Sequence, residues 1–106
     1  MPKSLTHIFS KLEKSLRALY GERFSRLVLF GSRARGDAEE GSDIDVLVVL
    51  KGGVNADAEI SCVAPTTARL SLKHNVVISC VYVSEEQYRR EKSPLLINIR
   101  REEVLI

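Results

Sequence analysis

The sequence predicts an α/β fold, a compact core in which a small mixed β-sheet is flanked by helices. Three short runs with strand composition, at 24–30, 43–50 and 76–83, alternate with segments of helical spacing or turn residues. The run at 43–50 is almost entirely apolar after Asp45, which is typical of a central strand. With 106 residues, 44% of them hydrophobic, the chain can form one core, and we expect one domain over 1–106.

The first half of the chain predicts a helix, two strands and a loop between the strands. Gly21 follows the first helix as a natural C-cap, and the segment 31–42, with three glycines, is expected to form a helical turn and a loop. The helix is expected over 5–20 because apolar residues recur there at helical spacing: Leu5, Ile8, Phe9, Leu12, Leu16, Leu19 and Tyr20.

The second half predicts a helix, a strand and two further helices. Residues 55–73 fit a helix loosely, and Pro65 is expected to start, kink or divide it. After the strand at 76–83, Ser84 and Gln87 have the spacing of a capping box for a short helix ending near Arg90. Pro94 suits the first turn of a last helix, and 104–106 are compatible with a short edge strand.

Composition excludes several classes of protein. No apolar run reaches membrane-spanning length and the N-terminus lacks a signal-peptide core, so we expect a cytoplasmic protein without a membrane partner. The net charge of +2 is mild, and the arginines near the C-terminus are expected on solvated helix faces, which makes nucleic acid an unlikely partner. Cys62 and Cys80 are expected to be reduced and buried.

The strand at 24–30 runs directly into Gly31-Ser32, which predicts a phosphate-binding turn. A strand that ends in Gly-Ser exposes backbone N–H groups to an anion, glycine permits close approach, and the hydroxyl of Ser32 adds a donor. Arg33 and Arg35 supply guanidinium groups for phosphate oxygens. Alone, this pattern is equally compatible with an ordinary strand–loop connection with solvated arginines.

Ten residues, 33–42, separate Ser32 from Asp43 and Asp45, which open the next strand. Side chains at i and i+2 of a strand point to the same face, and two adjacent carboxylates are unfavourable unless a cation compensates them. Asp43 alone could cap a turn, but Asp45 lies within an apolar run, where a charge needs a partner. Together with the Gly-Ser turn, the pair predicts a Mg²⁺ site and the equipment for nucleotidyl transfer.

At these residues the chain resembles the minimal nucleotidyltransferases (MNT) of the DNA polymerase β-like superfamily. The signature of that family is G-S, about ten residues, then D-x-D, and the resemblance extends from the first helix to the C-terminal segment 83–104. It implies that Gly31 and Ser32 hold the triphosphate of an NTP, such as ATP, while Asp43 and Asp45 hold Mg²⁺. Small members are often encoded with a helical HEPN-type partner and act as its antitoxin, sometimes by adding AMP to it.

One departure from the family pattern concerns the third strand, where a further carboxylate usually completes the site. The strand contains no Asp or Glu; we place the missing acid at Val77, with Asn75 or Ser79 as alternatives. His74, an acid from the 55–73 segment (Asp57 or Glu59) or a partner protein could compensate. Two functions therefore stay open: transfer of an NMP group, AMP in the first place, to a partner toxin, or an antitoxin that acts by complex formation with weakened catalysis. Homo-oligomerisation is also open.

Overall fold

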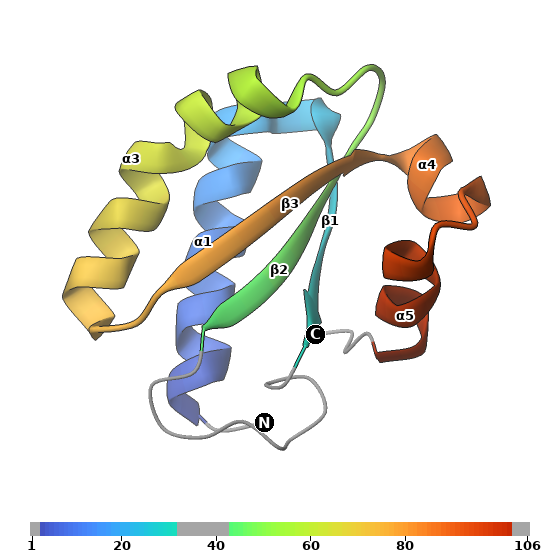
Figure 1. Ribbon diagram of the computed structural model, residues 1–106. Helices are drawn as coiled ribbons and strands as arrows, with labels where there is room; N and C mark the ends of the chain where they lie inside the picture. The colour runs from blue at the N-terminus through green and yellow to red at the C-terminus, as the bar shows by residue number, and fades with distance from the viewer. Residues whose placement is uncertain (1–2, 32–42, 103–106) are drawn as a thin grey trace.

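The computed structural model of the protein describes residues 3–31 and 43–102, and Figure 1 shows how their elements are arranged. In chain order they are α1 (Lys3–Tyr20), the 3₁₀ turn η1 (Gly21–Arg23), β1 (Phe24–Phe30), β2 (Ile44–Leu50), α3 (Ala56–His74), β3 (Ile78–Ser84), α4 (Glu85–Arg90) and α5 (Pro94–Glu102). None of the helices described is long and apolar enough to cross a lipid bilayer.

The three strands form one mixed sheet in the order β1-β2-β3. β1 and β2 are antiparallel, with Phe30 opposite Asp45, whereas β2 and β3 are parallel, with Asp45 opposite Ser79. The end of β1 therefore meets the beginnings of β2 and β3 at one end of the sheet. The central position predicted for the strand at 43–50 is confirmed, as is the mixed sheet.

Helices cover both faces of the sheet (Figure 1). On one face, the even-numbered side chains of β2 pack with α1 and α3 in a large apolar cluster that includes Phe9, Leu16 and Val63. On the other, the odd-numbered Leu47 and Val49 pack with residues of α4 and α5. This alternation is the period of two that a strand imposes on its side chains. It assigns Asp45 to the face that α4 and α5 cover.

The structure shows side-chain caps or a proline at the beginnings of α3, α4 and α5. The hydroxyl of Ser84 accepts a hydrogen bond from the Gln87 N–H, and the Gln87 side chain accepts one from the Ser84 N–H, so the capping box is present in full. Asn55 caps α3 by accepting from the Ala58 N–H at 3.1 Å. Pro94 begins α5 as expected.

Pro65 does not start or divide the helix predicted at 55–73, because α3 continues through it from Ala56 to His74. Proline removes one backbone hydrogen bond, to the carbonyl of Ser61, and crowds that carbonyl. Both Ser61 and Pro65 are exposed, so water can solvate the carbonyl that loses its partner. The cost is then small enough for packing on the opposite side of the helix, at Val63 and Leu70, to keep it intact.

Both cysteines are free thiols, but only one lies where the sequence suggests. Cys62 is exposed on α3, whereas Cys80 is partly buried on β3, and burial raises the pKa of the Cys80 thiol to about 11. The predicted burial of Cys62 is therefore wrong. The outer side of α3 contains small uncharged and apolar residues, so composition does not distinguish it from the buried side. The short strand suggested at 104–106 and the helical turn within 32–42 lie outside the described residues.

Candidate active site

The site residues that the structure describes lie near one another because three strand ends meet at one end of the sheet. Gly31 follows β1, Asp43 and Asp45 lie at the start of β2, and Ser79 lies near the start of β3. Of the six residues predicted to form the site, the structure describes Gly31, Asp43 and Asp45. The other three, Ser32, Arg33 and Arg35, lie outside the described residues.

Both aspartates are neighbours of one hydroxyl of the adjacent strand, that of Ser79. The hydroxyl of Ser79 donates to Oδ2 of Asp43 at 3.5 Å, and Ser79 stands opposite Asp45 in the ladder. Asp43 is exposed and Asp45 is partly buried. Two carboxylates and a hydroxyl form a set of hard oxygen donors, which fits Mg²⁺ if phosphate oxygens and water supply the remaining ligands.

Gly31 approaches Asp45 so closely that no side chain fits between them. Its φ angle is +79°, and a Cβ atom built on it would lie 2.5 Å from Oδ2 of Asp45. The carboxylate thus lies directly against the backbone at the beginning of the Gly-Ser turn. A phosphate bound by the N–H groups of this turn would be next to a cation held by Asp45, so the contact joins the two predicted halves of the site.

Substituting Gly31→Ala is expected to weaken nucleotide binding and to destabilise the fold. A non-glycine residue in the left-handed region costs about 1–2 kcal/mol, and the new methyl group would push the Asp45 carboxylate away. Thermal unfolding by circular dichroism and titration with a nucleotide measure the two effects. Gly52→Ala is the matched control, because Gly52 has the same φ of +79° but a Cβ added there would meet no atom within 4 Å. Equal loss of nucleotide binding in both variants would contradict the role of the Gly31–Asp45 contact.

The register of β2 and β3 shows which residue of the third strand lies next to the two aspartates. Ser79, not Val77, is opposite Asp45 and donates to Asp43. Val77 lies one step before β3, where its carbonyl accepts from the Ile44 N–H at 2.8 Å and its side chain is 56% exposed. Among the residues that the structure describes, no group of three His, Cys, Asp or Glu could hold a metal ion. The described part of the site therefore has two acids and a serine.

Neither acid of α3 compensates for this loss. Glu59 is only 6% exposed and accepts hydrogen bonds from the Tyr20 hydroxyl and the Asn55 N–H, both at 3.2 Å, with Arg23 at 3.7 Å. This cluster, which we call the Glu59 network, ties α1 and η1 to α3. Burial, reinforced by the Glu59 charge, raises the pKa of Tyr20. The network lies where β1 begins and β2 ends, at the opposite end of the sheet from Asp45, and Asp57 is in the same first turn of α3.

His74 is at the correct end of the sheet but on the wrong face. It ends α3, where its ring meets that of His7 from α1 edge-to-face at 6.0 Å between centroids. Burial and the neighbouring charges of Lys11 and Lys73 lower its pKa. The sheet separates this position from the face that Asp45 shares with α4 and α5. Of the three predicted substitutes, a partner protein is therefore the one that the described geometry leaves open.

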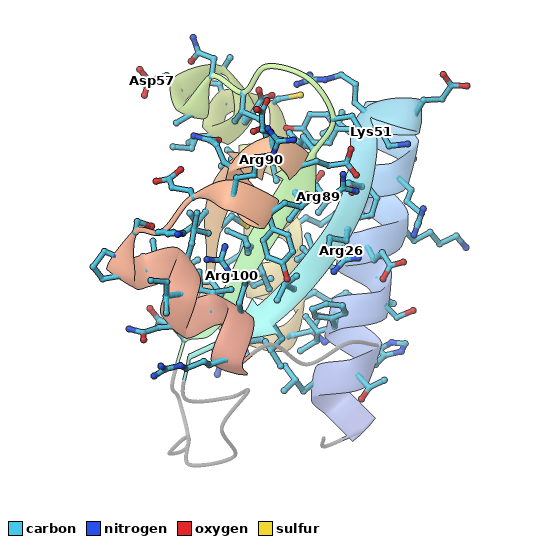
Figure 2. All side chains as sticks on the ribbon, turned by 90° about the vertical axis from the view of Figure 1, so that its right-hand side faces the viewer. Arg26, Lys51, Asp57, Arg89, Arg90 and Arg100 are labelled. Atoms are coloured by element: carbon cyan, nitrogen blue, oxygen red, sulfur yellow. The ribbon has the colours of Figure 1, made fainter. Side chains whose placement is uncertain are left out.

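Two arginines, one from α4 and one from α5, make contacts within the protein. Figure 2 shows Arg26, Arg89 and Arg100 on the side of the molecule formed by β1, α4 and α5. Arg89 pairs with Glu85 at 3.7 Å, and Arg100 donates to the backbone carbonyls of Tyr88 and Glu91 at 2.6 and 2.8 Å. Arg89 is exposed, as expected for a solvated helix face, whereas Arg100 is partly buried and makes contacts within the protein instead.

Comparison with known proteins places the chain in a family. Residues 9–103 match the model of the nucleotidyltransferase domain, and the protein belongs to that family. It is 38% identical over 77 residues to a protein of Methanocaldococcus jannaschii that carries the provisional name protein adenylyltransferase; the match covers 73% of this chain and 71% of the relative. A second protein of that organism with the same provisional name is 33% identical over 75 residues, covering 71% of this chain and 75% of its own.

Solved structures agree with this assignment. A provisionally assigned minimal nucleotidyltransferase is 27% identical, with a TM-score of 0.66, and the match covers 98% of this chain and 94% of that one. A toxin–antitoxin structure with AMP-PNP shares the fold at 21% identity and a TM-score of 0.64, over 91% of this chain and 69% of that one. The fold and the family predicted from the sequence are both confirmed.

Proposed function

We propose that this protein binds an NTP–Mg²⁺ complex at the meeting point of β1, β2 and β3 and transfers the NMP group, AMP from ATP in the first place, to a partner protein. The observation that supports this most directly is the contact of the Asp45 carboxylate with Gly31, which brings the predicted metal ligands to the predicted phosphate turn. The provisional name of the two archaeal relatives favours AMP as the group and protein as the acceptor.

In this proposal each residue has a distinct role. Gly31, with Ser32, Arg33 and Arg35, holds the triphosphate, and Asp43 and Asp45 hold Mg²⁺. A bound Mg²⁺ would supply charge neutralisation for the phosphates, which favours attack of the acceptor oxygen on the α-phosphorus and departure of pyrophosphate. Ser79 keeps Asp43 oriented by its hydrogen bond but cannot remove a proton from the acceptor. We expect transfer to be slow unless a partner supplies that base.

A second function is suggested by the serine, in place of a carboxylate, at position 79. A chain that binds nucleotide but lacks the third carboxylate is suited to act as an antitoxin that neutralises a helical HEPN-type partner by complex formation. The similar fold in a toxin–antitoxin structure with AMP-PNP is compatible with this function. The two functions share the nucleotide site. They differ in whether the AMP group is transferred to the partner protein.

Calorimetric titration with AMP-PNP tests the nucleotide site. We expect binding in the presence of Mg²⁺ and loss of binding with EDTA, because the triphosphate and the two aspartates repel each other without a cation. Titration of the Asp43→Asn variant should show weaker binding that responds less to Mg²⁺. Binding of equal strength with Mg²⁺ and with EDTA would contradict the metal site, and no binding in either condition would contradict the nucleotide site.

A further inference from the structure

A cluster of basic side chains lies where the first half of α1 meets the end of α3 (Figure 1). The rings of His7 and His74 meet edge-to-face with 6.0 Å between their centroids. Lys11, one turn after His7 on α1, has its amino group next to that of Lys73 on α3. We call these four side chains the His74 cluster. The sheet separates it from the face that Asp45 shares with α4 and α5, so it is not part of the nucleotide site.

Neither of the two helices brings an acidic side chain to this cluster. The one acid of α1, Glu13, pairs with Arg17 of the same helix at 3.1 Å. The two acids of α3, Asp57 and Glu59, are in its first turn, at the other end of the helix. The positive charge of the cluster is therefore not neutralised by the helices that form it.

The cluster contains polar atoms that lack a hydrogen-bond partner. A protonated lysine has three donors and no acceptor, so Lys11 and Lys73 cannot satisfy each other. The Nε2 atom of His74 is shielded from solvent and has no partner among the residues that the structure describes. Buried polar atoms are rarely left in this state, and such an atom indicates that a water molecule or an ion belongs beside it.

The electrostatics of the cluster agree with a missing anion. Burial, followed by the charges of Lys11 and Lys73, lowers the pKa of His74. The neighbouring Lys73 likewise lowers the pKa of Lys11. Like charges held this close disfavour the protonated forms, and an anion between them would remove the conflict.

The helix ends account for half of the cluster without a ligand. The carboxyl end of α3 favours cations in its last turn, where Lys73 and His74 lie. No such effect accounts for His7 and Lys11, because they belong to the first half of α1, whose amino end favours anions. The two halves are compatible with each other if an anion lies between them.

We propose that the His74 cluster binds the phosphate group of a small ligand, such as pyrophosphate or a nucleotide. A phosphate group carries close to two negative charges near neutral pH and has several acceptor oxygens, so it can accept from both lysines and from His74 at once. A carboxylate has one charge and two oxygens and would neutralise the cluster only in part. This inference goes beyond the proposed function and does not depend on it.

NMR titration of the histidine rings with pyrophosphate tests the site. The chain has two histidines, so a His7→Gln variant assigns both sets of ring signals. In metal-free buffer, where the nucleotide site should be empty, we expect pyrophosphate to shift the signals of both rings and to raise the pKa of His74. Lys11→Gln should raise the dissociation constant by about 10-fold or more, because one charge-assisted contact is lost.

Lys51→Gln is the matched control for Lys11→Gln. It removes the same charge from an exposed lysine that follows β2, at the opposite end of the sheet (Figure 2). Pyrophosphate binding should be unchanged in this variant. Equal weakening in both variants would overturn the inference, because binding would then reflect the net charge of the protein. Ring signals that do not move at millimolar pyrophosphate would overturn it as well.

Further titrations identify the source of the phosphate and separate this site from the nucleotide site. A weaker response to AMP than to pyrophosphate would identify free pyrophosphate as the ligand, and an equal or stronger response would identify a nucleotide. Acetate that binds as tightly as pyrophosphate would overturn the assignment to phosphate. Asp43→Asn should leave pyrophosphate binding at the His74 cluster unchanged while it weakens Mg²⁺-dependent binding of AMP-PNP. The inference and the proposed function can therefore fail separately.

Discussion

Replacing Ser79 by aspartate is expected to increase the rate of AMP transfer, by about 10²–10⁴ if proton removal from the acceptor limits the present rate. The new carboxylate would lie opposite Asp45 and next to Asp43, where it can ligate a second metal ion and accept a proton. Incorporation of label from ATP labelled in its α-phosphate, into the co-purified partner protein, measures the effect.

Two control variants make this experiment specific. Ser79→Asn has a similar size without the charge and should not increase transfer. Val77→Asp introduces the same carboxylate two residues away, at the position that the sequence alone suggests, and should give a smaller increase or none. Unchanged transfer in Ser79→Asp, with Mg²⁺-dependent nucleotide binding intact, would show that the missing carboxylate is not what limits the reaction.

Replacing Asp45 by asparagine is expected to reduce Mg²⁺-dependent transfer to background, because one of the two carboxylates that hold the cation is lost. Asparagine has nearly the same shape and removes a negative charge next to Asp43. We therefore do not expect the melting temperature of the metal-free protein to fall. Transfer of labelled AMP and thermal unfolding, measured on the same preparation, separate the loss of the site from a loss of the fold.

Glu86→Gln is the control for Asp45→Asn, since it changes the net charge equally at a side chain of α4 that is 77% exposed and outside the site. Transfer should be normal in this variant. If Asp45→Asn retained full Mg²⁺-dependent transfer in a folded preparation, the proposed metal site would be wrong. If transfer were undetectable in the wild-type protein but neutralisation of a partner survived the substitution, the antitoxin without catalysis would be the better description.

The fold is largely predictable because its signals are local. The apolar run of β2, the capping box at Ser84 and the proline at the start of α5 each act within a few residues. Pro65 shows the limit of local signals: tertiary packing at Val63 and Leu70 holds α3 together across a residue that would break an isolated helix. Cys62 is a second example of this limit. It is exposed although we expected it to be buried, because the sequence does not tell which side of a weakly amphipathic helix faces the core.

The candidate site is predictable in its acids but not in its geometry. The pairing of Asp43 and Asp45 follows from the alternation of a strand, which sequence shows directly. The contact of Gly31 with Asp45 depends on the register between β1 and β2, and the choice of Ser79 over Val77 depends on the register between β2 and β3. Register is fixed by the packing of whole strand faces, so it becomes visible only in the structure.

The Glu59 network has a consequence for how this protein can change over generations. The buried carboxylate secures α1 and α3 at one end of the sheet, whereas the residues of the candidate site lie at the other end, at the ends of strands. Substitutions at a position such as Ser79 therefore do not disturb the polar contacts that join these helices. A lineage built on this scaffold can therefore change the candidate site by a single amino-acid substitution while it keeps the contacts that hold these helices together.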